Sequence, residues 1–437
     1  MRADFSWFSK SAVTVGAVAL GAGVLAACGG GSSPAAAGPA AAGPITIGAS
    51  LSLTGSFQAD GVAFDRGYEL WARDVNAGGG IDGRPVRLTI LDNKSSANKV
   101  VTDYQTLINV DHVDLTFGPY TSLLTAAAAT VAADNGYAFI EGAGGAPSVF
   151  DAASNQADHN TFDVSLPVED TIMPFVDYIQ SLGSARDHTL TAAYPMANDP
   201  FAIPPVQLAE QKLHALGVRT LTGSSGLVAN PFTEEPQYYP PVAAAVAALH
   251  PDIVVLGSTD VPTVQKFMQV FEQQNYTPKL FLAAAGPDQG AAFTKAVGAA
   301  DANGVMVPDG WYPGFQNATS ERMVSEYVKT YGGTASGVNA DVAEAYSVGQ
   351  VAAAAIEKTG GTDNTKIIQY LHSGAMLQTV QGPVQFNALG ENVAADAFVF
   401  QWQDEGTNFV QVLPQDASGS KAIYAVKPAW AATATAG

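Results

Sequence analysis

Short apolar runs alternate along this chain with segments whose apolar residues recur every three or four positions. The first run covers residues 45–50, and the first helical segment carries Phe64, Tyr68, Trp71 and Val75 on one face. Further strand-like runs lie at 86–90, 113–117, 137–140, 189–194, 252–257, 279–283, 304–308, 382–387 and 398–402. The strand–helix alternation predicts largely parallel sheets with helical crossovers.

The strand–helix order begins a second time after Pro167. The folded part of the chain, about 390 residues, is longer than a usual single domain. We therefore predict an α/β fold of two doubly wound, Rossmann-like lobes. Ligands of such sheets bind at the carboxyl ends of the strands, so the cleft between the lobes is the expected site.

The start of the chain predicts export. An apolar run over residues 12–27 ends in Leu25-Ala-Ala-Cys28, which holds the only cysteine. The run is shorter than the roughly 20 residues that cross a bilayer, so it is interpreted as a signal peptide, residues 1–27. Leu-Ala-Ala-Cys resembles the lipobox of bacterial lipoproteins, which implies a lipidated Cys28 and an extracytoplasmic protein anchored to the cell membrane. A signal peptide cut to leave a free thiol is the alternative. Residues 28–44, rich in Gly, Ala, Ser and Pro, form a flexible linker.

Charge and cysteine content exclude several classes of protein. The chain has 40 acidic and 20 basic residues, a net charge of −20, which disfavours nucleic acid and anionic lipid surfaces as partners. Six scattered histidines lack the spacing of a zinc site, and we expect neither metal nor cofactor. No P-loop or G-x-S-x-G motif is present, and Gly142-x-Gly144-x-x-Pro147 departs from the dinucleotide fingerprint. We predict that the protein is not an enzyme; a secreted hydrolase would need a nucleophile and base that no motif indicates. Single acidic residues are interpreted as solvated surface.

Two loops of the first strand–helix block are candidate binding elements. The strand 113–117 leads into Tyr120, Thr121 and Ser122, where Ser122 suits the N-cap of the next helix. Hydroxyls and amides at a helix N-terminus suit a carboxylate, although capping alone also explains them. After the strand 137–140, the small residues Ala143, Gly144 and Gly145 allow a ligand close to the backbone.

The remaining candidates come mostly from the second block. Asp260 and Asp288 follow strands and suit either a ligand ammonium group or helix capping. Trp311 suits either an apolar part of the ligand or the junction of the lobes. The other predicted ligand contacts are aromatic or hydroxyl residues of the loops at strand ends: Phe57, Tyr194, Phe201 and Thr259.

Four segments resemble one family. They are residues 45–55 (ITIGASLSLTG), 74–83 (DVNAGGGIDG), 382–387 (GPVQFN) and 400–402 (FQW). With the lipobox, they are similar to the extracytoplasmic solute-binding proteins of ABC importers, of the branched-chain amino acid-binding (leucine/isoleucine/valine) type. The resemblance spans nearly the whole mature chain.

The resemblance implies a type I periplasmic binding protein fold with three hinge crossings, near Ser165, residues 304–308 and Asn387. It implies an N-terminal lobe of 45–165 plus 305–387 and a C-terminal lobe of 166–304 plus 388–430. In the family, the two first-block loops bind a ligand carboxylate and an acid of the second lobe binds the ammonium. Here Gly145 or Ala146 stands where a hydroxyl is usual, so an amino acid, an amide and an aromatic acid all remain open as ligands.

The implied partners are a small-molecule ligand and the permease and ATPase subunits of an importer, with the protein itself a monomer. A ligand-sensing subunit for a membrane signalling receptor is the alternative function.

Overall fold

The computed structural model describes residues 43–150, 159–183, 189–233, 235–314, 317–417 and 419–431. The predicted signal peptide, Cys28 and nearly all of the predicted linker lie outside the described residues. Within the described ranges, every helix is too short or too polar to cross a membrane.

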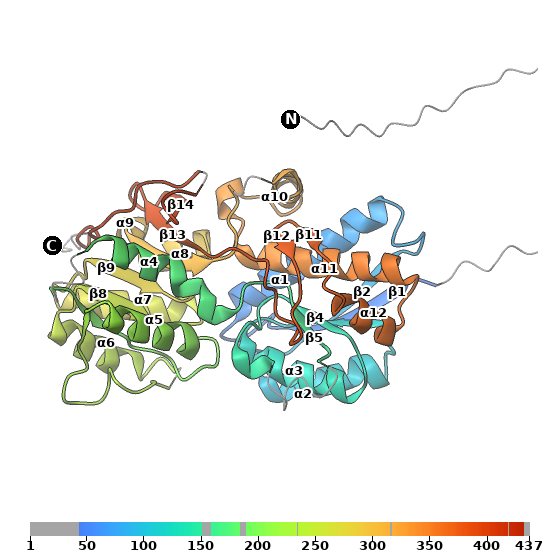
Figure 1. Cartoon of the computed structure of the whole chain (residues 1–437), viewed down its shortest axis with the longest axis horizontal. Coiled ribbons are helices and arrows are strands. Elements are labelled where there is room, and N and C mark those ends of the chain that lie inside the picture. Colours follow the sequence, from blue (N-terminus) through green and yellow to red (C-terminus); the bar gives the residue numbers. More distant parts are fainter. Residues whose placement is uncertain are drawn as a thin grey trace, which may run out of the picture. The chain divides into compact units, whose positions relative to one another are not determined.

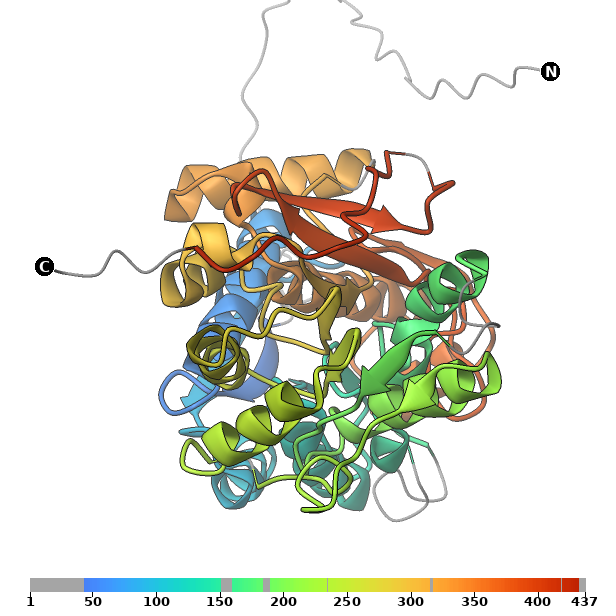
Figure 2. The same cartoon turned by 90° about the vertical axis from the view of Figure 1, so that its left-hand side faces the viewer.

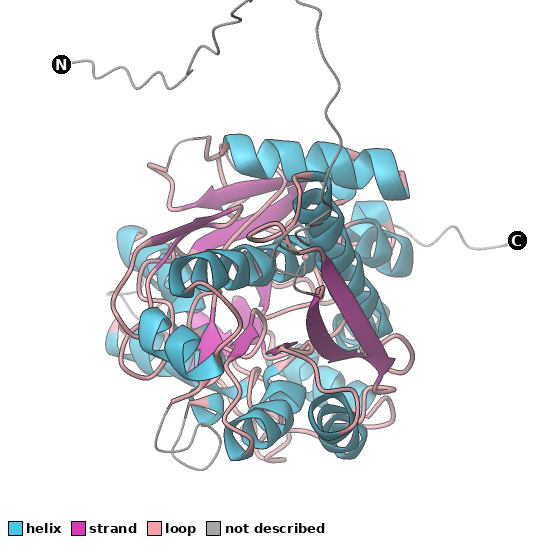
Figure 3. Ribbon diagram, turned by 90° about the vertical axis from the view of Figure 1, so that its right-hand side faces the viewer, coloured by secondary structure: helices cyan, strands magenta, loops and turns pink. Residues whose placement is uncertain are grey.

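The first lobe is built on a five-stranded parallel sheet in the order β2-β1-β3-β4-β5 (Figure 1). Its strands are β1 (Ile45–Leu51), β2 (Val86–Asp92), β3 (Leu115–Phe117), β4 (Phe139–Glu141) and β5 (Thr161–Asp163). Its helices are α1 (Gln58–Ala77), α2 (Ala97–Asn109), α3 (Ser122–Asp134), α10 (Ala318–Tyr331), α11 (Ala340–Thr359) and α12 (Asn364–Leu371). Figure 3 looks onto this lobe, where helices flank the strands.

The longest helices of the first lobe, α1 and α11, pack closely because two glycines meet the partner helix. A Cβ on Gly349 would lie 2.1 Å from the Trp71 ring, and a Cβ on Gly67 would lie 2.6 Å from the Ala345 side chain. Trp71 itself is 1% exposed, on the face that the sequence predicted to be buried. Any side chain at either glycine would push the two helices apart.

The second lobe is built on a seven-stranded sheet in the order β14-β13-β10-β9-β8-β6-β7. Its strands are β6 (Thr191–Ala193), β7 (Arg219–Thr220), β8 (Ile253–Leu256), β9 (Leu280–Ala283), β10 (Val305–Asp309), β13 (Phe398–Gln403) and β14 (Asn408–Leu413). The last two are antiparallel, and Figure 2 shows them in red at one edge. Its helices are α4 (Met173–Ser181), α5 (Ile203–Ala215), α6 (Tyr239–Leu249), α7 (Val261–Gln273), α8 (Ala291–Val297) and α9 (Ala299–Ala302), and the short 3₁₀ turn η2 (Val168–Ile172) precedes α4. Two other 3₁₀ turns, η1 (Pro147–Val149) after β4 and η4 (Ala335–Gly337) before α11, pack against helices of the first lobe.

The α/β fold class predicted from the sequence is confirmed, and each predicted strand overlaps an observed one. Residues 230–241 are rich in proline, and the last of these prolines lie in the first turn of helix α6. Tyr239 is its first residue, and prolines at the following positions cost nothing because the first amides of a helix have no intrahelical acceptor.

The second crossing between the lobes lies later in the chain than the sequence placed it. Strand β10 pairs with β9 and β13, so residues 305–309 belong to the second lobe rather than to the N-terminal lobe. The chain crosses after Asp309, and then adds α10, α11, α12, β11 (Leu377–Thr379) and β12 (Gly382–Val384) to the first lobe before β13. A buried apolar strand looks the same in either lobe, so its sequence gives no sign of the sheet it joins.

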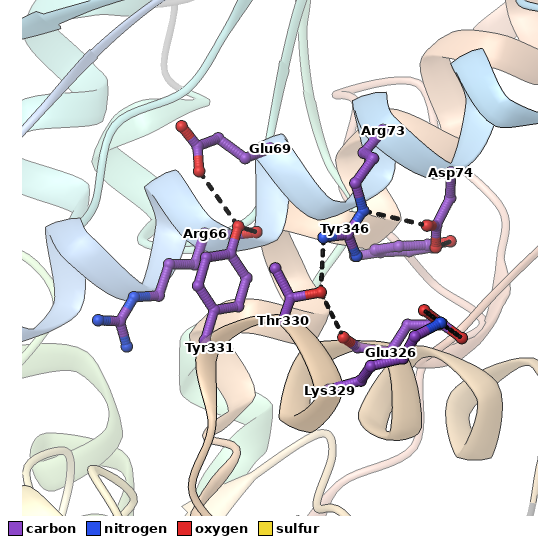
Figure 4. Close-up of polar contacts among 9 residues, drawn as sticks. All are labelled: Arg66, Glu69, Arg73, Asp74, Glu326, Lys329, Thr330, Tyr331 and Tyr346. Carbon is purple, nitrogen blue, oxygen red and sulfur yellow. Dashed lines mark hydrogen bonds and ion pairs between the residues drawn. The ribbon is translucent and has the colours of Figure 1, made fainter.

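Helix α10 is attached to the first lobe by polar contacts with α1 (Figure 4). The Arg73 guanidinium donates to the Thr330 hydroxyl at 2.5 Å, and the Tyr331 hydroxyl donates to Glu69 at 3.1 Å. On α11, the Tyr346 hydroxyl donates to Asp74 at 3.0 Å. These contacts place α10 and α11, which follow the crossing in the chain, in the first lobe.

Candidate ligand-binding site

A cavity lies where the carboxyl ends of both sheets meet. Its empty volume, with open solvent at the mouth included, is about 720 Å³. The first lobe contributes Tyr120, Thr121, Gly142, Ala143, Gly145, Asp163, Ser165, Ala340, Asp341, Glu344 and Gln381. The crossing segment and the second lobe contribute Leu166, Val168, Thr171, Phe201, Ala284, Ala285, Asp288, Pro308, Asp309 and Gly310.

The loop after β3 brings two hydroxyl groups to the cavity. The Tyr120 hydroxyl donates to the carbonyl oxygen of Thr259 at 3.0 Å, which links the two lobes. Thr121 precedes α3 with a positive φ of 65°, and its buried hydroxyl has no hydrogen-bond partner. Ser122 is the first residue of α3 instead of its N-cap, and its hydroxyl accepts from the Ala146 amide at 3.2 Å.

Backbone amides of the loop after β4 donate hydrogen bonds to a carboxylate of the protein itself. The amides of Ala143 and Gly144 both donate to one oxygen of Glu141, at 2.9 and 2.6 Å. A Cβ on Gly145 would lie 2.9 Å from an oxygen of Asp163, so the carboxylate stands where a side chain at 145 would be. The small residues therefore bring the backbone close to acidic groups of the chain.

Five carboxyl groups line the cavity. Asp163 ends β5 and accepts from the Ser165 amide at 2.8 Å, while Asp309 ends β10 and accepts from the Gly310 amide at 2.6 Å. Asp341 and Glu344 lie on the first turns of α11, three residues apart and so on one helix face. The fifth, Asp288, follows β9.

A glutamine amide joins acids of the two lobes. The Gln289 side chain donates to Asp288 at 3.0 Å and to Asp341 at 2.9 Å. The Asn339 side chain donates to the Gln289 oxygen at 2.9 Å. Like the bond from Tyr120, this network links the two lobes.

Burial and mutual repulsion disfavour the charged forms of these acids. Burial raises the pKa of Asp163 to about 7. Burial followed by the charge of Asp288 holds the pKa of both Asp309 and Asp341 well above the usual range, and burial with several acidic neighbours does the same for Glu344. Burial also raises the pKa of Asp288. These acids therefore keep their protons to a higher pH than free carboxyl groups do.

The structure brings six of the residues predicted as ligand contacts to the cavity wall: Tyr120, Thr121, Ala143, Gly145, Phe201 and Asp288. Four others lie just behind the wall: Phe57 packs edge-on against Tyr120, and Ser122, Gly144 and Thr259 bond to residues named above. The contact of any of them with a ligand stays a prediction.

The other three predicted contact residues do not line the cavity; one caps a helix and two are buried in the cores of the lobes. Asp260 caps α7, since its carboxylate accepts from the Thr263 amide at 2.8 Å. Trp311 is 0% exposed in the core of the first lobe and donates to the Ser320 hydroxyl at 2.9 Å. Tyr194 is buried among apolar residues of the second lobe.

Sequence reasoning missed four of the five acids, because single acidic residues were interpreted as solvated surface. Asp163 and Asp309 are the last residues of buried strands, a position that could have drawn attention to Asp309 after the predicted strand 304–308. Asp341 and Glu344 were hidden in the start of a long alanine-rich helix. Among the described residues, no group of three or more His, Cys, Asp or Glu side chains is arranged to hold a metal ion.

A cavity between two doubly wound lobes, reached by strand-end loops of both, is the architecture of a binding protein that closes on its ligand. The sequence model of the family described as periplasmic binding protein matches residues 44–407. The chain therefore belongs to the periplasmic binding protein family, a family of binding proteins rather than enzymes, and one whose location is extracytoplasmic.

Solved structures share the fold at low sequence identity. The branched-chain amino acid transporter substrate-binding protein LivJ of Streptococcus pneumoniae, in complex with isoleucine, has a TM-score of 0.69 at 18% identity, covering 84% of this chain and 99% of that one. A solute-binding protein of an ABC transporter from R. palustris, in complex with benzoate, has a TM-score of 0.68 at 17% identity, covering 84% and 95%. The leucine-binding protein LivK of Thermotoga maritima has a TM-score of 0.68 at 17% identity, covering 85% and 100%.

Proposed function

We propose that this protein is the solute-binding component of an ABC importer, which captures a small polar solute between its lobes and delivers it to a membrane permease. The observation that carries the proposal is the cavity itself, whose wall comes from strand-end loops of both lobes. The similar structures support it, since two are named as transporter proteins in complex with benzoate or isoleucine and the third is named a leucine-binding protein.

Closure follows from contacts that need both lobes at once. The bonds from Tyr120 to Thr259 and from Gln289 to Asp341 form only when the lobes are together. A solute that touches both walls adds its own binding free energy to the closed state and shifts the hinge equilibrium. The permease then distinguishes the closed, loaded form from the open one.

Anchoring through a lipidated Cys28 belongs to the same proposal. A tether outside the folded lobes keeps a monomeric receptor near its permease without a basic membrane-binding surface, consistent with the net charge of −20. Mass spectrometry of the mature N-terminal peptide should find acyl chains on Cys28, and a Cys28→Ser variant should be released from membranes. A free thiol in the native protein would contradict anchoring and leave solute binding untouched.

Small-angle scattering tests solute capture directly. The purified protein is measured alone and with amino acids, amides, aromatic acids and amines, and any solute that also raises the melting temperature is followed in uptake assays of a strain lacking the gene. We expect at least one solute to reduce the radius of gyration and to depend on the gene for uptake. A protein that neither contracts nor gains stability with any of them would contradict the proposal.

A further inference from the structure

The cavity wall carries acidic groups of both lobes and no group of opposite charge. Asp163, Asp341 and Glu344 come from the first lobe, and Asp288 and Asp309 come from the second. Among the described residues, the lining contains no lysine, arginine or histidine. A charged ligand in such a site is favoured only if it is a cation.

The loop amides that would suit a ligand carboxylate are already used. Glu141 accepts from the amides of Ala143 and Gly144, and the Ser122 hydroxyl accepts from Ala146. An incoming carboxylate would have to displace a buried carboxylate of the protein from these donors. The first turn of α3 can still receive an anion, so anionic and zwitterionic probes are the necessary comparison.

Two uncharged groups of the wall lack partners and point to a hydrogen-bonding ligand. The hydroxyl oxygen of Thr121, a residue 2% exposed, has no hydrogen-bond partner. The side-chain oxygen of Gln381 is also buried without a partner, while its amide nitrogen lies 3.5 Å from the Ser165 hydroxyl. Buried polar atoms without partners are costly, and an ammonium group supplies the donors that both oxygens can accept.

The acids reach the cavity from several elements of both lobes. Asp288 and Asp341 accept from the same side-chain nitrogen of Gln289, and Asp163 and Asp309 end strands of different sheets. The described residues hold no cluster suited to a metal ion. Five lining acids, with no lysine, arginine or histidine among the lining residues, can pair with more than one positive charge, as on a chain with an ammonium group at each end.

We propose that the solute is a small organic cation with two or more ammonium groups and no carboxylate, of the aliphatic diamine or polyamine class. This inference rests on the proposed function and specifies the solute class of the same site.

Proton release is a consequence of this assignment. The acids facing the cavity share their surroundings with Asp60 on α1, Asp260 before α7, Glu141 and Glu391, and with the Tyr120 hydroxyl, all of which are acidic groups. Because burial and these neighbours raise the pKa values of the lining acids, an arriving dication ionises some of them and releases protons. An anionic solute would instead draw protons in.

Titration calorimetry of the purified protein tests the proposal. The probes are 1,4-diaminobutane, 1,5-diaminopentane and spermidine, against isoleucine, benzoate, glutamate, and Mg²⁺ or Ca²⁺ alone. Each titration is run at pH 7 in two buffers of different ionisation enthalpy, so that the number of protons exchanged is measured. We expect an amine to bind with proton release, more tightly than any of the other probes.

Variants show whether the cavity acids hold the amine. Asp309→Asn and Glu344→Gln keep the side-chain shape and should each raise the Kd of the amine at least tenfold. The matched control is Asp103→Asn, because Asp103 is a buried first-lobe acid that bonds to Ser50 outside the cavity. It should leave the Kd within twofold. Removing a like charge relieves repulsion, so both cavity variants should fold with unreduced melting temperature at pH 8.

The outcomes separate this inference from the function beneath it. Scattering that shows closure with isoleucine, benzoate or glutamate, and no amine binding, overturns the cation assignment and leaves a solute receptor in place. Binding of Mg²⁺ or Ca²⁺ in preference to every amine also overturns it. Amine binding that the two cavity variants do not weaken has the same effect. No binding and no closure with any probe contradicts the function itself.

Discussion

The Tyr120 hydroxyl donates a hydrogen bond of 3.0 Å to the backbone carbonyl of Thr259, and it thereby joins a first-lobe loop to a second-lobe loop. The ring is fixed from behind, with Phe57 and Phe64 at centroid distances of 5.9 and 6.0 Å. The next residue, Thr121, lines the cavity. The position of one aromatic side chain is therefore tied both to closure and to the wall that meets the solute.

We expect Tyr120→Phe to weaken solute binding about fivefold, since one net hydrogen bond contributes about 1 kcal/mol to the closed state. Scattering of the ligand-free variant should show a larger open population. Tyr68→Phe is the matched control, because the Tyr68 hydroxyl donates to Gly118 inside the first lobe. That control should lower the free energy of unfolding without changing affinity. Equal affinities for the wild type and Tyr120→Phe would show that the bond has no part in closure.

A methyl group at Gly145 should disturb the cavity wall. In Gly145→Ala the new Cβ would lie 2.9 Å from both an Asp163 oxygen and the Leu166 carbonyl, so the carboxylate or the crossing segment must move. Overpacking of this kind costs about 1–3 kcal/mol, and we expect solute affinity to fall by about tenfold. Gly310→Ala, also in the wall, meets its nearest neighbour at 3.9 Å and should bind normally. Calorimetric Kd values for the pair check the expectation.

Asp260→Ala should lower the free energy of unfolding and leave the affinity for the solute unchanged. Asp260 caps α7 through Thr263, and loss of such a cap costs about 1 kcal/mol of folding free energy. Urea unfolding measures the loss, and calorimetry measures affinity, which should change less than twofold. A large rise in Kd with unaltered stability would instead assign Asp260 to the solute.

The ligand-free protein should lose stability as the pH rises from about 4 to about 7. Burial raises the folded-state pKa of Asp163 from 3.8 to about 7, so the folded state holds more protons than the unfolded state across that interval. Asp163→Asn removes this charge and should raise the free energy of unfolding at pH 8, by about 4 kcal/mol at most from the size of the shift. At pH 3, where the acid is protonated in both states, the variant and the wild type should be alike. Urea unfolding at both pH values checks this, and a destabilised variant at pH 8 would contradict it.

The architecture was predictable from the chain because helix and strand periodicities are local. The spacing of Phe64, Tyr68 and Trp71 identified the buried face of α1, and the run 252–257 contained β8. The lobe assignment of β10 was wrong, because pairing with β9 and β13 is a long-range property.

The loops that line the cavity were predicted from the sequence, but the acidic character of the cavity was not. Tyr120 and Gly145 stand at strand ends and so were found, whereas Asp341 lies within a helix whose register against the other lobe no local pattern reveals. The hydrogen bonds from the loop amides to Glu141 were equally unpredictable. The sequence does not show whether a backbone amide is free or already bonded to another residue of the chain.

Helix α11 begins at the solute and runs for 20 residues, so its far end lies about 30 Å away at 1.5 Å per residue. The close approach to α1 at Gly67 and Gly349 leaves little room between the two helices. A displacement of Asp341 should therefore move α11 together with α1 and so reach the side of the first lobe that is remote from the cavity.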